Sequence, residues 1–114
     1  MQDCIFCRIA SGEAPARLVH SSARTLAFHD RRPLAPTHVL VTPREHVASL
    51  WELVDPELAG ELLLTAAQVA RELGLERGFR VIANTRGDGG QEVEHLHLHV
   101  LGGRRLGPML SRTS

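Results

Sequence analysis

Three histidines alternate with apolar residues near the C-terminal end of this 114-residue chain. In the run His95-Leu96-His97-Leu98-His99-Val100 a strand would project all three imidazoles from one face, because successive side chains of a strand point to opposite sides. A neutral imidazole can attack phosphorus and leave again, which splits one displacement into two easier steps. Because imidazole titrates near neutral pH, a neighbouring histidine can protonate a leaving group or activate water. Taken alone, the triplet is equally typical of a solvent-facing or metal-binding strand.

Glycine-rich backbone directly precedes the histidine run. We expect the segment Arg86-Gly87-Asp88-Gly89-Gly90-Gln91 to form a flexible loop. With few side chains in the way, such a loop approaches a phosphate closely and presents N–H groups to it. A nucleophile, a proton donor and an N–H cradle are the parts that a metal-free phosphoryl-transfer site needs. The two segments together therefore favour that chemistry.

The two cysteines, Cys4 and Cys7, also have a spacing with chemical meaning. In an intracellular protein we expect reduced thiols or metal ligands rather than a disulfide. Their spacing is that of a zinc half-site, and histidines elsewhere could complete two thiolates and two imidazoles. One helix face carrying both thiols suits plain packing equally well. A redox role is disfavoured, because no strand precedes the pair in a thioredoxin-like arrangement.

Caps, periodicity and turns predict the elements that position these residues. We expect a short helix from Cys4 to Ala10, and a long helix that starts at Asp55-Pro56 and stops at Gly74. Strands are expected over residues 18–21, 24–29, 37–42, 79–84 and 95–101. Strands interrupted by one long helix, with short connections, predict an α+β fold with a mainly antiparallel sheet. The length predicts a single domain over residues 1–114.

Composition restricts the classes of partner. Thirteen basic residues balance thirteen acidic ones, so no overall field attracts a nucleic acid or an anionic membrane. A local site can still bind a small anion. The first residues do not have the pattern of a signal peptide, and the apolar stretches are far shorter than a membrane span. We therefore expect a soluble cytoplasmic protein with no nucleic-acid or membrane partner.

The segment from Asp88 to Arg104 resembles the active-site signature of the histidine triad family with its preceding glycine loop. The Leu-Gly-Gly-Arg ending is similar to the Hint branch, the histidine triad nucleotide-binding proteins, rather than to the Fhit branch. Upstream, the blocks Phe28-His29-Asp30, Ala35 to Pro43 and Cys4-Ile5-Phe6-Cys7 also match, so the resemblance covers nearly the whole chain. It implies a five-stranded, mainly antiparallel sheet with one long and one short helix.

The resemblance further implies cleavage of purine nucleoside 5′-phosphoramidates to a nucleoside monophosphate and an amine through a nucleotidyl-histidine intermediate. By motif position, His97 is the nucleophile and His99 contacts the phosphate. His38 supports the triad of His95, His97 and His99 from an adjacent strand. Asp30 matches a carboxylate that binds both ribose hydroxyls. The other expected nucleotide contacts are Asn84, Gly90, Gln91, Glu92, Val93, Phe6, Ile9, Leu40 and His29.

Not all of these contacts are equally specific. Phe6, Ile9 and Leu40 would form an apolar slot for the base, and ordinary core packing explains each of them equally well. His29 has the character of a surface strand residue rather than a catalyst. The expected ligand is a purine nucleotide of the AMP type.

A metal and a dimer are implied by the same resemblance. The metal is a structural zinc bound by Cys4, Cys7, His46 and His95, and catalysis by histidine requires no cofactor. The dimer is a two-fold homodimer that joins two sheets into one of ten strands. The long helix and the strand over residues 79–84 could supply its apolar contact.

Two departures from the family pattern affect the expected specificity. Glu92 stands where many relatives carry Ser or Thr. Because a carboxylate binds an amine and repels an anion, it predicts a preference for amine-leaving phosphoramidates over polyphosphates. The tail over residues 105–109 lacks the Trp-Pro-Pro ending of animal Hint proteins, which reaches the partner subunit's site. The sequence therefore does not predict how the tail of a partner subunit would affect substrate specificity.

Three other functions remain open from the sequence. The first is a dinucleoside polyphosphate hydrolase, as in the Fhit branch, which Gly102-Gly103-Arg104 argues against. The second is a nucleotide-binding or adaptor protein with residual catalysis. The third is a zinc-binding module with no nucleotide role, in which the loop over residues 87–91 would bind no anion.

Overall fold

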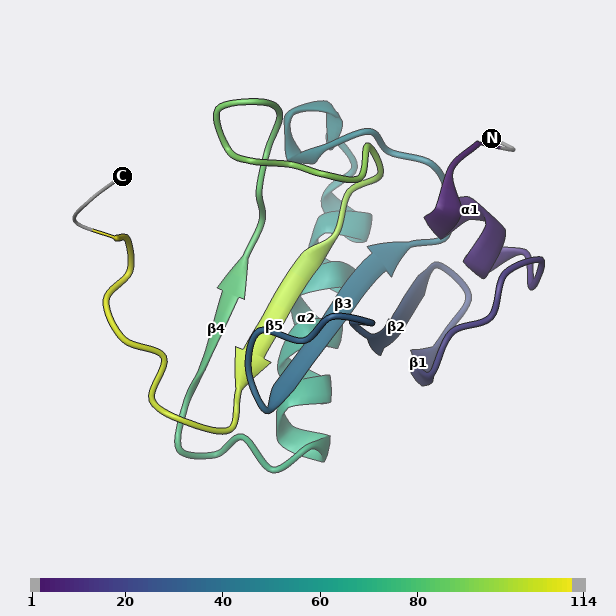
Figure 1. Cartoon of the computed structure of the whole chain (residues 1–114). Coiled ribbons are helices and arrows are strands. Elements are labelled where there is room, and N and C mark those ends of the chain that lie inside the picture. Colours follow the sequence, from purple (N-terminus) through teal and green to yellow (C-terminus); the bar gives the residue numbers. More distant parts are fainter. Residues whose placement is uncertain (1–2, 112–114) are drawn as a thin grey trace.

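A single antiparallel sheet of five strands organises the computed structural model, which describes residues 3–111 (Figure 1). In chain order the elements are α1 (Ile5–Ala10), β1 (Leu18–Ser21), β2 (Thr25–His29), β3 (Thr37–Pro43), the 3-10 helix η1 (Leu50–Glu52), α2 (Pro56–Glu72), β4 (Phe79–Ile82) and β5 (Leu98–Gly102). The strand order is β1-β2-β3-β5-β4, and every neighbouring pair is antiparallel. The predicted α+β class, with one long and one short helix, is confirmed.

Helix α2 covers one face of the sheet (Figure 1). Its start follows from Asp55, whose carboxylate accepts hydrogen bonds from the N–H groups of Glu57 and Leu58, and from Pro56 in the first turn. The main core lies between this helix and the sheet and is built from Ala27, Val39, Val41, Leu58, Leu62, Ala66, Val69, Ala70, Leu75, Leu96, Leu98 and Val100. Among the described residues, no helix is both long and apolar enough to cross a membrane.

The opposite face of the sheet carries a second, smaller apolar cluster. Phe28 and Leu40 alternate with the core residues of β2 and β3, so they point away from α2 and pack with Phe6 of α1. On β5, His99 alternates in the same way with Leu98 and Val100. The predicted catalytic residues therefore lie on the face that α2 leaves uncovered.

Strand β5 is shorter than predicted, because it begins at Leu98 rather than at residue 95. The pairing of β3 with β5 stops at Val41 and Leu98. Two residues further along β3 comes Pro43, which has no N–H to donate and whose carbonyl oxygen accepts a hydrogen bond from the His95 ring at 2.8 Å. The ladder cannot continue past this point. The prediction that one strand face carries all three histidines is therefore wrong for His95 and His97.

Two smaller differences concern short elements. Strand β4 ends at Ile82, two residues before the predicted end. The 3-10 helix η1 was not predicted, because a single turn is too short to show a periodic pattern. It lies between β3 and α2, and its residues contact the glycine loop described below.

Candidate active site

His97 is held by the backbone two residues before it. Its Nδ1 lies 2.7 Å from the carbonyl oxygen of His95. A carbonyl oxygen only accepts hydrogen bonds, so the Nδ1 atom carries the proton and the neutral ring keeps its lone pair on Nε2. The ring of Phe6 meets that of His97 edge-on, with 5.1 Å between ring centroids, and His97 is only 7% exposed. The lone pair that would act as nucleophile is therefore fixed in both tautomer and place.

His38 and His99 form a directed pair beside it. The N–H of Leu34 donates to Nδ1 of His38 at 3.0 Å, so the proton of a neutral His38 ring is on Nε2. That Nε2 lies 2.9 Å from Nδ1 of His99, to which it donates. His99 then carries its own proton on Nε2. The rings of His97 and His99 lie 5.0 Å apart between centroids, so this donor is next to His97.

Burial determines the charge of this pair. Loss of hydration, with smaller contributions from the neighbouring His97 and His38, lowers the pKa of His99 to about 4, although the carboxylate of Asp30 acts in the opposite direction. Loss of hydration also lowers the pKa of His38, although the carboxylate of Asp30 acts in the opposite direction. The Asp30 carboxylate oxygen lies 3.5 Å from Nε2 of His38. Both imidazoles are therefore neutral at neutral pH, as the hydrogen-bond directions require.

Residues predicted to form the slot for the base are brought together by the fold. Phe6, Phe28 and Leu40 form the buried part of the smaller apolar cluster, and Ile9 and Val93 pack against it. The rings of Phe6 and Phe28 meet edge-on, with 5.5 Å between centroids. Through Phe6 this cluster adjoins His97 directly.

The four predicted metal ligands also converge. Nδ1 of His95 lies 3.2 Å from Sγ of Cys4 and 3.5 Å from Sγ of Cys7, and Nδ1 of His46 lies 3.4 Å from Sγ of Cys7. All four donor atoms lie within 4.8 Å of one another. Because Nε2 of His95 donates to the Pro43 carbonyl oxygen, its Nδ1 lone pair faces the two sulfurs. Two thiolates and two imidazoles are a donor set that fits zinc.

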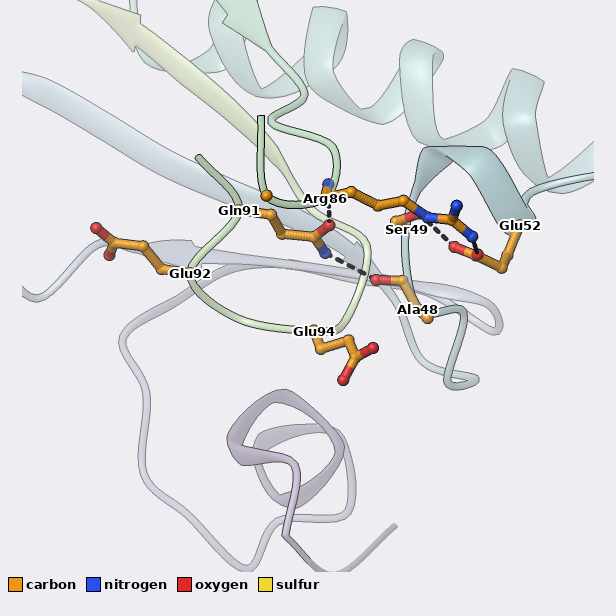
Figure 2. A pocket seen from close by; sticks show the side chains of 8 residues that line it. Ala48, Ser49, Glu52, Arg86, Gln91, Glu92 and Glu94 are labelled. Atoms are coloured by element: carbon orange, nitrogen blue, oxygen red, sulfur yellow. Dashed lines mark hydrogen bonds and ion pairs between the residues drawn. The ribbon is translucent and has the colours of Figure 1, made fainter. Parts of the chain in front are cut away.

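The glycine loop packs against the segment that contains η1 (Figure 2). Gln91 lies at the centre of this contact, because its Oε1 accepts from the N–H of Arg86 at 2.8 Å and its Nε2 donates to the carbonyl oxygens of Ala48 and Val93. At Gly89 a Cβ atom would lie 2.4 Å from the carbonyl oxygen of Thr85, so only glycine fits there. The Gln91 amide thus stabilises the loop itself.

A cavity of about 550 Å³ lies beside this loop. Its lining consists of Ala48, Ser49, Glu52, Arg86, Gly87, Gln91, Glu92 and Glu94. In the part of the chain that the structure describes, no histidine lines it. Glu92, the residue that departs from the family pattern, is exposed at this cavity.

Several residues with a place near the site had no signal in the sequence. Arg86 contacts Trp51 and Glu52 across the gap between the loop and η1, and no pattern in the sequence indicates a role for any of the three. Gly89 was predicted only as part of a flexible loop. Two predicted contacts lie at strand ends: His29 ends β2, and Asn84 is half-buried two residues beyond β4.

Comparison with known proteins shows the family of this chain. The family described as HIT domain matches residues 11–106. The chain belongs to the HIT family. The purine nucleoside phosphoramidase of Escherichia coli K12 is 41% identical over 113 residues, which cover 96% of this chain and 95% of that protein.

Solved structures of HIT proteins have the same fold. A HIT family hydrolase from Legionella pneumophila superposes with a TM-score of 0.89 at 45% identity, covering 92% of this chain and 96% of that one. A zinc-bound histidine triad family protein from Mycobacterium smegmatis superposes with a TM-score of 0.81 at 34% identity, covering 97% of this chain and 81% of that one. The predicted family and fold are therefore confirmed.

Proposed function

We propose that this HIT protein hydrolyses purine nucleoside 5′-phosphoramidates to a nucleoside monophosphate and an amine. The observation that carries the proposal is the hydrogen bond from Nδ1 of His97 to the His95 carbonyl oxygen, which leaves a lone pair on Nε2. A hydrolase and a phosphoramidase among the relatives support the same activity. The neutral His38–His99 pair supplies a directed N–H beside the nucleophile.

The reaction proceeds in two displacements. In the first, Nε2 of His97 forms a bond to phosphorus, the bond from phosphorus to nitrogen breaks, and the amine leaves with one proton taken up from solvent. In the second, water attacks phosphorus and gives up one proton to solvent, the bond to Nε2 breaks with its electron pair returning to the imidazole, and the nucleoside monophosphate is released. Nε2–H of His99 donates to a phosphate oxygen, Asp30 binds the ribose hydroxyls, and the smaller apolar cluster receives the base.

The first experiment measures turnover of a fluorogenic adenosine phosphoramidate by the wild type and by His97→Ala. We expect the variant to lose activity by about 1000-fold or more while AMP still binds. His20→Ala, a change on β1 outside the described site, is the matched control and should retain full activity. Equal activity of His97→Ala and the wild type would reject His97 as nucleophile. AMP binding without turnover in either protein would favour a nucleotide-binding protein instead.

Glu92 bears on the choice of leaving group. A carboxylate beside the cavity attracts a departing amine and repels a departing polyphosphate. We therefore propose that phosphoramidates are preferred to dinucleoside polyphosphates. The kcat/KM values for the two substrate classes, with Glu92→Gln as the comparison, measure this preference; equal values in the wild type would contradict it.

We also propose that the Cys4, Cys7, His46 and His95 cluster holds a structural zinc. The donor set and the orientation of His95 support this, as does the zinc in the M. smegmatis relative. When bound, the ion would join α1 to the loop that precedes β5, and it would supply no step of the reaction. Elemental analysis of protein purified without chelator should give about one zinc per chain. Absence of zinc from such protein would reject the site.

A two-fold homodimer completes the proposal. Strand β4 is an edge of the sheet, and its Phe79 and Val81 side chains are 44% and 38% exposed. Exposed apolar residues on an edge strand support an isologous contact there. Sedimentation of the wild type should give a dimer and that of Val81→Lys a monomer. A monomeric wild type would reject this part of the proposal.

A further inference from the structure

Arg86 has a backbone conformation that needs support. Its φ of 56° lies in the left-handed region, which residues other than glycine rarely adopt. The loop closes on this residue in both directions: the Arg86 N–H donates to Oε1 of Gln91, and the Gln91 N–H donates to the Arg86 carbonyl oxygen at 3.1 Å. Between these two residues lie Asp88 and three glycines, and the glycines have no side chains to anchor the loop. The shape of the loop therefore depends on what holds its two ends.

The Arg86 side chain is held by η1. Its guanidinium forms an ion pair with the carboxylate of Glu52 and lies over the Trp51 ring, 5.2 Å from the centroid. Figure 2 shows Arg86 and Glu52 reaching toward each other, whereas Glu92 points away from them. We refer to Trp51, Glu52 and Arg86 as the η1 clamp.

The clamp is itself anchored within η1. The Ser49 hydroxyl accepts from the Trp51 N–H at 3.1 Å and donates to the Glu52 carboxylate. Hydrogen bonds from Ser49 and then from Arg86 lower the pKa of Glu52, so this carboxylate stays anionic. At the other end of the loop, Gln91 is tied to the same segment through the Ala48 carbonyl oxygen at 2.8 Å. Both ends of the loop are thus fixed to one short stretch of chain.

We propose that Arg86, held by Glu52 and Trp51, is a positioning residue that keeps the glycine loop in the shape that receives the substrate phosphate. The inference rests on the proposed function, because the loop has a phosphate to receive only if the substrate is a nucleotide. In this proposal Arg86 is not a phosphate ligand, because its guanidinium is already paired with the carboxylate of Glu52. The phosphate meets the backbone N–H groups that follow, toward Val93 and the histidines.

Substitution of Glu52 separates positioning from direct binding. If Arg86 were a phosphate ligand, Glu52→Gln would free its charge and strengthen AMP binding. If Arg86 positions the loop, Glu52→Gln, which removes the ion pair, and Arg86→Ala, which also removes the cation–π contact, both release the loop and weaken AMP binding, by up to about 10-fold. Arg86→Lys keeps the charge beside Glu52 and should recover part of the affinity.

The experiment is calorimetric titration of AMP and of adenosine into the wild type and these three variants. Adenosine has no phosphate, so its affinity should stay within about 2-fold throughout, since only the phosphate contacts change. Arg77→Ala, which replaces an exposed arginine in the turn before β4, is the matched control and should bind AMP as the wild type does. Unchanged or tighter AMP binding by Glu52→Gln, or an equal loss of AMP and adenosine binding, would overturn the inference.

A second measurement does not depend on activity. Amide hydrogen exchange over residues 87–93 should become faster in Glu52→Gln and Arg86→Ala, whereas exchange within α2 should stay the same. Unchanged exchange in the loop would overturn the inference even if the enzyme cleaves phosphoramidates. A wild type that neither binds AMP nor cleaves a phosphoramidate would instead reject the proposed function, and the inference with it.

Discussion

The histidines and the glycine loop adjoin each other in the sequence, but the fold positions them in different ways. His38, His95 and His97 are buried, and each has a ring nitrogen that is fixed by a hydrogen bond to a backbone N–H or carbonyl group. The loop is exposed, and side chains at its two ends hold it to η1. In the first region the backbone orients side chains, and in the second side chains orient the backbone.

This difference separates the consequences of mutation. A buried imidazole with a fixed tautomer acts only in that form, so its loss removes a step of the reaction. When a loop is held by several exposed contacts, the loss of one of them changes its conformation only in part, because each such contact contributes little free energy. We therefore expect changes at the histidines to lower kcat, and changes at the loop mainly to weaken nucleotide binding.

After the loss expected of His97→Ala, the largest effect should follow from His38→Ala. Without its Nε2–H, nothing fixes the proton of His99 on Nε2, the nitrogen that would face the phosphate. We expect kcat for a nucleoside phosphoramidate to fall by about 100-fold, with a smaller change in AMP affinity. His38→Gln keeps a donor at this position and should recover part of the loss. If His38→Ala changed AMP affinity and left kcat unaltered, the two regions would not differ in the way described.

Gly89→Ala tests the loop from the inside. The new Cβ atom would meet the backbone of Thr85, which cannot move as a flexible side chain can. We expect a loss of stability of about 1–3 kcal/mol with weaker AMP binding. At Gly87 a Cβ would meet nothing within 4 Å, so Gly87→Ala is the matched control. Equal melting temperatures and AMP affinities for the two variants would contradict the packing described.

The buried histidines should make stability depend on pH. The pKa of His99 falls from 6.5 to about 4 on folding, chiefly because it loses hydration. Between these values the unfolded chain binds a proton that the folded chain does not, so stability is lost as the pH falls from about 6.5 toward 4. Replacement by His99→Gln should make this decline shallower in thermal melts, whereas His20→Gln on β1 should not. If the stability of His99→Gln declined with falling pH as steeply as that of the wild type, His99 would not be the source of this pH dependence.

The smallest effect is expected at an exposed ion pair away from the loop. Glu45 lies 2.5 Å from Arg24, and its side chain is 55% exposed. Glu45→Gln should change the free energy of unfolding by less than about 0.5 kcal/mol and leave AMP affinity unaltered. Comparing the AMP affinities of Glu45→Gln and Glu52→Gln shows whether the effect of Glu52 depends on its contact with the glycine loop. If both variants weakened AMP binding equally, loss of negative charge alone would explain the result.

The sequence predicted the fold well because its elements leave regular signals, whereas the catalytic roles of the histidines stay a prediction. The turns between strands, the cap at Asp55 and the resemblance of the segment around His97 each depend on residues close together in the chain. The start of β5 was wrong because the limit on its pairing is set by Pro43, far away in the sequence. The η1 clamp was missed for a similar reason. Arg86 and Trp51 meet only after folding, and nothing in the residue type of Arg86 indicates a left-handed conformation.

His95 makes three different contacts, each through a different atom. Its carbonyl oxygen orients His97, its Nε2 ends the β3–β5 ladder at Pro43, and its Nδ1 faces the cysteines. A substitution of the ring leaves the carbonyl in place but breaks both ring contacts at once. An engineer who wished to remove the cysteine cluster while keeping the hydrolase would therefore have to change Cys4, Cys7 or His46 and leave His95 untouched.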